Sequence, residues 1–134
     1  VFVQVHKEKD LPWAMEEALK CDTLSAVVGD MRDLDFTTSR RFQLAVEKSR
    51  VTGFVIRNQK SKLNPTACFT RWKITPQHSV SLELPGVGFP KWHIHLQKVR
   101  NGKPGEWELH WDGSKFVFHG ATAQEDATER LKVG

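Results

Sequence analysis

The sequence lacks any apolar run long enough to cross a bilayer. No stretch of the 134 residues approaches the roughly 18 apolar residues of a membrane-spanning helix. No charged segment followed by an apolar one opens the chain, as a signal peptide would require. With 39% apolar and 27% charged residues, the composition predicts one soluble domain with a hydrophobic core. We therefore expect a cytoplasmic protein that does not associate with a membrane.

Cysteine is scarce, and the motifs of nucleophilic and metal chemistry are incomplete. Cys21 and Cys68 lack the CxxC spacing, which favours buried thiols over a disulfide or a metal pair. No GxSxG sequence surrounds a serine. His93 and His95 stand two residues apart, so a strand would place both rings on one face, but no spaced carboxylate or cysteine completes a closed site. We predict neither a metal site nor a catalytic residue.

Acidic residues are nearly absent from the middle of the chain. Residues 48–105, the central basic block, carry eleven bases and the single acid Glu83, a net charge of +10. Each flank carries −3, and the whole chain carries +4. A block of this kind suits a polyanion such as nucleic acid or nucleotide phosphate. The alternative is that these bases are scattered over a solvated surface.

The first half of the chain alternates between apolar strands and amphipathic helices. We predict strands at 1–5, 25–29 and 51–57, and helices at 11–20 and 39–49. The run SAVVG is continuous rather than alternating, as in a strand covered on both faces. The order predicts a parallel three-stranded β-α-β-α-β core. Because the chain opens inside an apolar run without an initiator Met, we expect an N-terminally truncated fragment.

The second half changes to alternating apolar and polar residues separated by turns. Further strands are predicted at 67–75, 80–83, 92–99, 107–111 and 116–119. The turns between them are expected at Thr75-Pro76, Pro85-Gly86, Asn101-Gly102 and Asp112-Gly113. The expected fold is therefore α/β, with an antiparallel meander and a β-hairpin following the parallel core. We expect one core over residues 1–119 and a polar tail at 120–134.

Two features of the first half suggest binding chemistry. Asp30 ends an apolar strand in a β-α-β setting, where a magnesium-coordinating acid would stand. No GxxxxGK[ST] motif occurs, so Asp30 is at most half of a nucleotide site. Arg40 and Arg41 lie on the first turn of the helix predicted at 39–49, where their charge opposes the helix dipole. A partner explains these bases better than helix stability does.

Five segments, in this order and spacing, carry a family resemblance. They are LPWAMEEALKCDTLSAVVGDM, TTSRRFQLAVEKS, VTGFVIRNQ, NPTACFTRWKI and WHIHLQKVRNGKPGEWELHW, spanning roughly residues 10–118. The most specific pieces are PWAMEEALK with SAVVGD, the RRFQLA helix and KVRNGKPGEWEL. The set resembles the ImuA family of bacterial RecA-like proteins, which are tied to error-prone DNA repair and sometimes grouped with the cell-division inhibitor SulA. The resemblance implies a RecA-like core whose phosphate-binding loop would precede Val1.

The resemblance also assigns roles to individual bases. The loops at 31–36 and 60–64 take the places of the two DNA-facing loops of RecA, and the LQKVR segment matches a RecA strand whose lysines reach nucleotide phosphates across a subunit interface. Lys98 and Arg100 stand two apart in that segment, so on one face. The candidate nucleotide-binding residues are therefore Asp30, Lys98 and Arg100. The candidate DNA-binding residues are Arg40, Arg41, Arg57, Lys60 and Lys62.

The function implied by the resemblance is that of a RecA-like accessory protein in damage-induced (SOS) translesion repair and mutagenesis. The implied partners are an ImuB-like polymerase homologue, an error-prone replicative-type polymerase, RecA and DNA. ATP and magnesium are implied for the full-length parent, and this chain alone is not expected to be an enzyme. Two alternatives remain open. One is a DNA-binding ATPase whose P-loop lies upstream of Val1, and the other is a non-enzymatic interaction module of the cell-division-inhibitor type.

Overall fold

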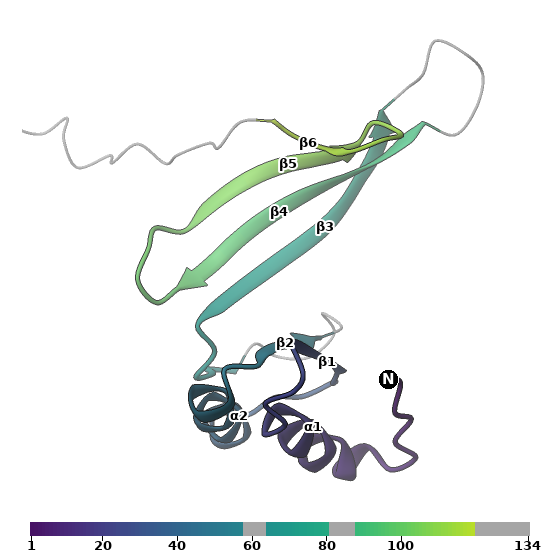
Figure 1. Ribbon diagram of the computed structural model, residues 1–134. Coiled ribbons are helices and arrows are strands. Elements are labelled where there is room, and N and C mark those ends of the chain that lie inside the picture. Colours follow the sequence, from purple (N-terminus) through teal and green to yellow (C-terminus); the bar gives the residue numbers. More distant parts are fainter. Residues whose placement is uncertain (58–63, 81–87, 120–134) are drawn as a thin grey trace, which may run out of the picture. The chain divides into compact units, whose positions relative to one another are not determined.

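The chain folds as two units, each built around its own sheet (Figure 1). The computed structural model describes residues 1–57, 64–80 and 88–119. The first unit is Val1–Cys68, with a two-stranded parallel sheet, and the second is Phe69–Gly134, with a four-stranded antiparallel sheet. The predicted α/β class is confirmed. The single core expected over 1–119 stays a prediction, and the tail at 120–134 lies outside the described residues.

The first unit contains two helices and two parallel strands. Its elements are η1 (Glu8–Asp10), α1 (Leu11–Leu19), β1 (Ala26–Asp30), α2 (Phe36–Ser49) and β2 (Thr52–Ile56). Pro12 stands in the first turn of α1, where a missing N–H costs no helical hydrogen bond. The Ser49 hydroxyl donates to the Leu19 carbonyl at 2.6 Å and so satisfies an oxygen at the end of α1.

The strand predicted at 1–5 is wrong. In the structure of residues 1–57, this segment pairs with neither β1 nor β2, and its first side chains are exposed. An alternating pattern forms a strand only where a neighbour completes the hydrogen-bond ladder. The parallel core of the described residues therefore has two strands instead of three.

Helix α2 begins three residues earlier than predicted. The Asp35 carboxylate accepts a hydrogen bond from the Thr38 backbone N–H at 2.6 Å, so Asp35 is the N-cap. This bond holds the pKa of Asp35 below its ordinary value. The new start places Arg40 and Arg41 in the second turn, where the helix dipole is weak. The dipole argument for a partner at these two arginines is therefore wrong.

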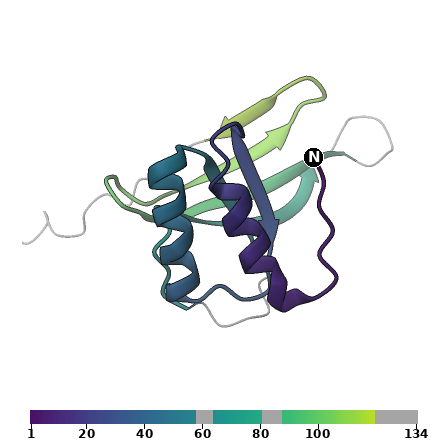
Figure 2. The same ribbon diagram turned by 60° about the horizontal axis from the view of Figure 1, so that its bottom comes forward.

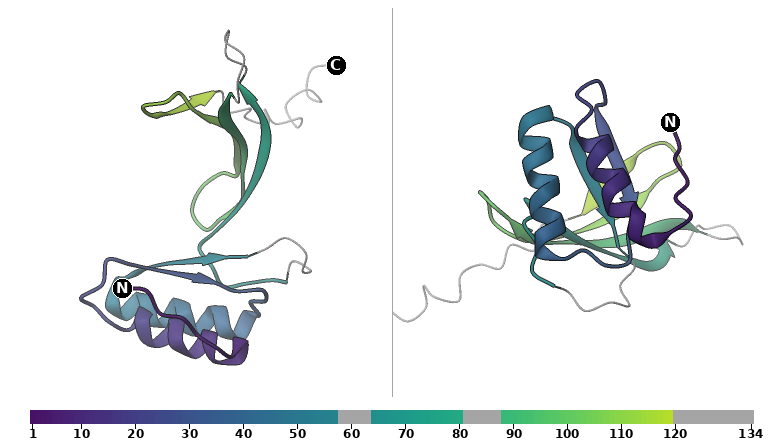
Figure 3. Two further views of the ribbon diagram at one scale, coloured as in Figure 1. Left: turned by 90° about the vertical axis from the view of Figure 1, so that its right-hand side faces the viewer. Right: turned by 90° about the horizontal axis from the view of Figure 1, so that it is seen from below.

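The core of the first unit lies between the helices and one face of the sheet. Figures 2 and 3 show α1 and α2 side by side, on the same side of the two strands. Val27 pairs with Gly53, and Gly29 pairs with Val55, so these four residues face the helices. A Cβ at Gly29 would lie 2.5 Å from the Met15 sulfur, so α1 approaches the strand closely. The buried apolar residues are Met15, Leu19, Met31, Leu34, Phe42, Ala45 and Val51.

The opposite face of this sheet is apolar and exposed. Val28 lies opposite Phe54, and Ile56 follows two residues later on the same face. All three side chains are more than half exposed. The run at 25–29 predicts a strand covered on both faces, but the described residues of the first unit cover only one.

The second unit is an antiparallel meander with the predicted hairpin at its centre. Its strands are β3 (Thr70–Val80), β4 (Phe89–Val99), β5 (Gly105–Trp111) and β6 (Phe116–His119), side by side in this order in Figure 1. Asn101 and Gly102 lie in the turn between β4 and β5, as predicted. The meander and the hairpin are therefore confirmed.

The turn predicted at Thr75-Pro76 is wrong, because β3 continues through it. Pro76 lies in the strand opposite Trp92. Proline lacks the backbone N–H of a ladder, but β3 is an edge strand in the order of this sheet, where proline is tolerated. Residues 81–83 of the strand predicted at 80–83, and the turn at Pro85-Gly86, lie outside the described residues.

The two faces of the second sheet differ in character. The register places Trp92, Ile94 and Leu96 of β4 on one face, beside Trp107 and Leu109 of β5. The Trp72 and Trp107 ring centroids lie 6.1 Å apart on this face. The other face carries Lys91, His93 and His95 of β4 and the two glutamates of β5. Alternation of apolar and polar residues therefore predicts the faces correctly over this stretch.

Replacing Leu19 by Ala should strongly destabilise the first unit. Its side chain is fully buried, so the change removes apolar contacts and leaves a cavity. We expect a loss of about 2–5 kcal/mol in the free energy of unfolding, measured by urea denaturation. Leu44→Ala is the matched control, because the Leu44 side chain of α2 is 52% exposed. Equal losses in the two variants would contradict the core described above.

The turn between β5 and β6 should show a specific acid sensitivity. The Asp112 carboxylate accepts from the backbone N–H groups of Lys115 and Ser114, which lower its pKa from 3.8 to about 2. A lowered pKa contributes stability that is fully present above the unfolded value and lost as the pH falls through the folded one. The difference in urea midpoint between the wild type and Asp112→Asn should be largest above about pH 4 and shrink toward about pH 2. A difference that does not change with pH would rule out this origin.

Candidate functional site

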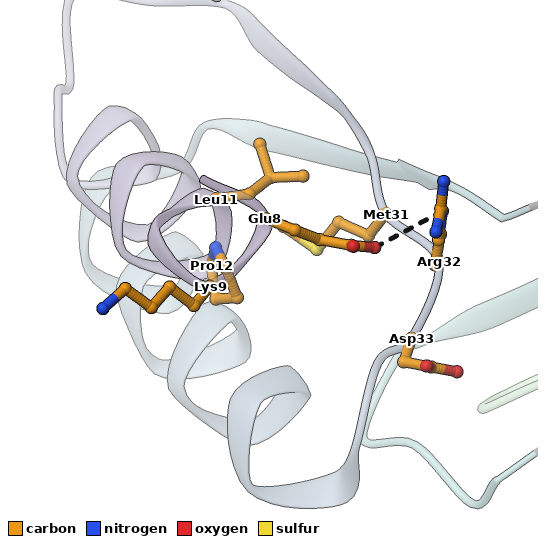
Figure 4. A pocket seen from close by; sticks show the side chains of 7 residues that line it. All are labelled: Glu8, Lys9, Leu11, Pro12, Met31, Arg32 and Asp33. Carbon is orange, nitrogen blue, oxygen red and sulfur yellow. Dashed lines mark ion pairs between the residues drawn. The ribbon is translucent and has the colours of Figure 1, made fainter. Parts of the chain in front are cut away.

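A hollow at the carboxyl end of β1 is the candidate site of the first unit. It has a volume of about 330 Å³, and Figure 4 shows the side chains that line it. They are Glu8, Lys9, Leu11, Pro12, Met31, Arg32 and Asp33. A second hollow, of about 300 Å³, shares Glu8, Leu11 and Arg32 with the first and adds Asp30. The carboxyl ends of parallel strands are where open α/β sheets bind ligands.

Charged groups of both signs surround these hollows. The Arg32 Nε lies 3.5 Å from a carboxylate oxygen of Glu8, the pair drawn in Figure 4. Both side chains are largely exposed, so this ion pair contributes little to stability. Arg57 follows β2, and its Nη2 lies 3.9 Å from a carboxylate oxygen of Asp33. The Arg57 side chain is only 16% exposed, so this predicted DNA-binding residue is largely covered.

Asp30 occupies the position that the sequence predicts for it. It is the last residue of β1, pairs in register with Ile56 and lines the second hollow. It offers one carboxylate to a magnesium ion, but the described residues include no GxxxxGK[ST] loop that would hold the phosphates. The nucleotide-binding role of Asp30 therefore stays a prediction.

The two arginines of α2 make contacts within the first unit. Arg41 forms an ion pair with Glu16 and so links α2 to α1. Lys20 also pairs with Glu16, at 3.1 Å. The Arg40 guanidinium donates to the Gln43 side chain at 2.8 Å. These contacts give both arginines a structural role, and their contact with DNA stays a prediction, as does that of Lys60 and Lys62, which lie outside the described residues.

The structure brings Lys98 and Arg100 together at the end of the β3–β4 ladder. Lys98 lies opposite Arg71, and the Arg100 backbone N–H donates to the Phe69 carbonyl at 3.0 Å. The Arg100 guanidinium carbon lies 4.1 Å from the centroid of the Phe69 ring. Lys98 and Arg100 belong to the second unit, whereas Asp30 belongs to the first. Their joint role at a nucleotide stays a prediction.

Histidines of the second unit form two clusters, of which the sequence pattern indicates only the His93 and His95 pair. Glu106 lies on β5 with one carboxylate oxygen 3.2 Å from His93 and the other 3.4 Å from His95. The rings of His110 and His119 stack at 4.8 Å, with their nitrogens 2.9 Å apart. The Asn-Gly turn, read with the correct register, would have placed Glu106 opposite His95. Among the described residues, no group of three or more metal-binding side chains has the geometry of a metal site.

The helices of the described residues carry no membrane-spanning character. None of them is long and apolar enough to cross a bilayer.

Sequence comparison identifies curated relatives of this chain. No family model matches, and no solved structure is similar at a significant level. Protein ImuA from two strains of Caulobacter vibrioides is 32% identical over 119 residues, which covers 81% of this chain. The chain spans about half of the length of these relatives, 49% in each case. Over the matched region, this chain is therefore an ImuA-like protein.

Proposed function

We propose that this chain belongs to a RecA-like accessory protein of damage-induced, error-prone translesion repair. The similarity to ImuA over 81% of the chain carries this proposal. The protein would act by binding, in the cytoplasm, with an ImuB-like polymerase homologue, an error-prone replicative-type polymerase or RecA as its partner.

DNA is the ligand that the central basic block suits. The block carries +10 over residues 48–105, and such charge gives salt-dependent affinity for phosphates. Arg57 ends up at the carboxyl edge of the first sheet, and Lys60 and Lys62 follow it closely in the sequence. We propose that these three bases, with Arg40 and Arg41, contact DNA.

Substituting both loop lysines should weaken DNA binding. In Lys60→Gln/Lys62→Gln, the slope of log affinity against log salt should become shallower by about 1.4, since each lost contact to a single strand removes about 0.7. Fluorescence anisotropy of a labelled single-stranded oligonucleotide measures both affinity and slope. The matched control is Lys7→Gln/Lys9→Gln, which removes the same charge from an acidic flank. An unchanged slope in the first variant would remove these lysines from the DNA interface.

A nucleotide-dependent activity of the full-length parent is the second candidate. The position of Asp30 favours it, because this carboxylate lies at the carboxyl end of a parallel strand and lines a hollow. Magnesium would be the ion held there, with ATP supplying the phosphates.

If the second candidate is correct, Asp30→Asn in the full-length parent should weaken magnesium-dependent ATP binding at least tenfold. Isothermal titration calorimetry with and without magnesium measures this effect. Asp22→Asn is the control, because Asp22 lies in the loop before β1 and lines neither hollow. Equal ATP affinity for the wild type and Asp30→Asn would exclude a role for this carboxylate.

A further inference from the structure

Four cations and one aromatic ring gather at the end of the second sheet where β3 begins and β4 ends. Arg71 lies directly opposite Lys98, and Phe69 lies opposite Arg100. The two pairs are two residues apart on both strands, so all four side chains share one face of the sheet. Lys73 stands two residues beyond Arg71 on β3. We call Phe69, Arg71, Lys73, Lys98 and Arg100 the cationic cluster.

A shift in strand register assembles this cluster. Trp72 pairs with Leu96, but the preceding Arg71 pairs with Lys98, so β4 has one extra residue, Gln97, at this point. Because the extra residue belongs to β4, β3 keeps its alternation, and Arg71 shares a face with Lys73 rather than with Trp72. Lys98, opposite Arg71, lies on the face of Lys73 as well. Alternation along β4 alone would have placed Lys98 on the apolar face with Leu96.

The cluster concentrates charge of one sign. Side chains directly opposite each other in an antiparallel pair have Cβ atoms about 4.5–5.5 Å apart, so Arg71 and Lys98 are close neighbours on this face. The two strand segments, 69–73 and 97–100, contain no acidic residue. Of the glutamates of β5, Glu106 lies opposite His95, which itself lies opposite Lys73, and Glu108 pairs with Lys91. The positive charge of the cluster suits a negatively charged ligand.

We propose that the cationic cluster binds the phosphodiester backbone of single-stranded nucleic acid. The β3 part, from Phe69 to Lys73, extends over about 13 Å, the length of four strand residues at about 3.3 Å each. Cations spread over this length can contact successive phosphates of one strand. The Arg100 guanidinium carbon lies over the Phe69 ring, and the Phe69 side chain is 47% exposed, which leaves room for stacking with an unpaired base.

The proposal rests on the DNA binding proposed above and adds a separate contact surface in the second unit. The test uses the full chain and a labelled single-stranded oligonucleotide, followed by fluorescence anisotropy over a range of salt. Arg71→Gln and Lys98→Gln should each lower the affinity about fourfold at 0.15 M salt and reduce the salt slope by about 0.7. Lys115→Gln, which removes one exposed charge from the turn before β6, should leave both unchanged.

Additional variants distinguish an effect of charge on DNA binding from an effect on folding and from DNA binding by the first unit. Arg71→Lys should retain the wild-type slope, and circular dichroism should show the same fold for every variant. If Arg71→Gln and Lys98→Gln bind like the wild type while Lys60→Gln/Lys62→Gln binds weakly, the cluster is overturned and the proposed function stands. If the wild type does not bind at low salt, the proposed DNA binding fails and the cluster fails with it.

Competition distinguishes the nature of the ligand. An unlabelled oligonucleotide should displace the probe, whereas ATP with magnesium at equal phosphate concentration should not. If ATP displaces the probe from the wild type but not from Arg71→Gln, the cluster binds a nucleotide instead and the proposal is overturned. If a polyglutamate peptide displaces the probe as effectively as the oligonucleotide does, the cluster binds an acidic protein segment, and the proposal is again overturned.

Discussion

The parallel pairing of β1 with β2 is the interaction on which the first unit depends. The register sets Gly29 and Gly53 on the face toward the helices, where their lack of a side chain lets Met15 and Leu19 of α1 approach the strands. The same pairing ends both strands at one edge, where the Arg57 guanidinium comes within ion-pair distance of Asp33. The packing of α1 against the strands and the position of the candidate ligand site therefore both follow from the pairing of β1 with β2.

In the second unit, the equivalent constraint is the register of β4 against its two neighbours. Its pairing with β5 brings Glu106 between His93 and His95, whose rings approach the two oxygens of one carboxylate. Its pairing with β3 shifts by one residue at Gln97 and so places Lys98 opposite Arg71. A one-residue shift changes the face on which every later side chain lies, which is why a single unpaired residue decides the composition of the cationic cluster.

Both units expose large apolar side chains on their sheets. Val28, Phe54 and Ile56 form an exposed apolar face on the parallel sheet, and Trp72, Ile74, Phe116 and Phe118 are exposed on the other sheet. Parallel strands are usually covered on both faces. Large apolar faces of this kind are typical of surfaces that contact further protein.

The sequence by itself determined the α/β class, the hairpin at Asn101-Gly102 and the place of Asp30 at the end of a strand, because hydrophobic periodicity and turn residues are local properties. It also determined the ImuA-like resemblance. Only the tertiary structure decided that residues 1–5 form no strand, that β3 passes through Pro76 and that Arg41 joins Glu16. It also decided that Arg71 faces Lys98. These features depend on which strand or helix lies alongside, and that neighbour is set by contacts between residues far apart in the chain.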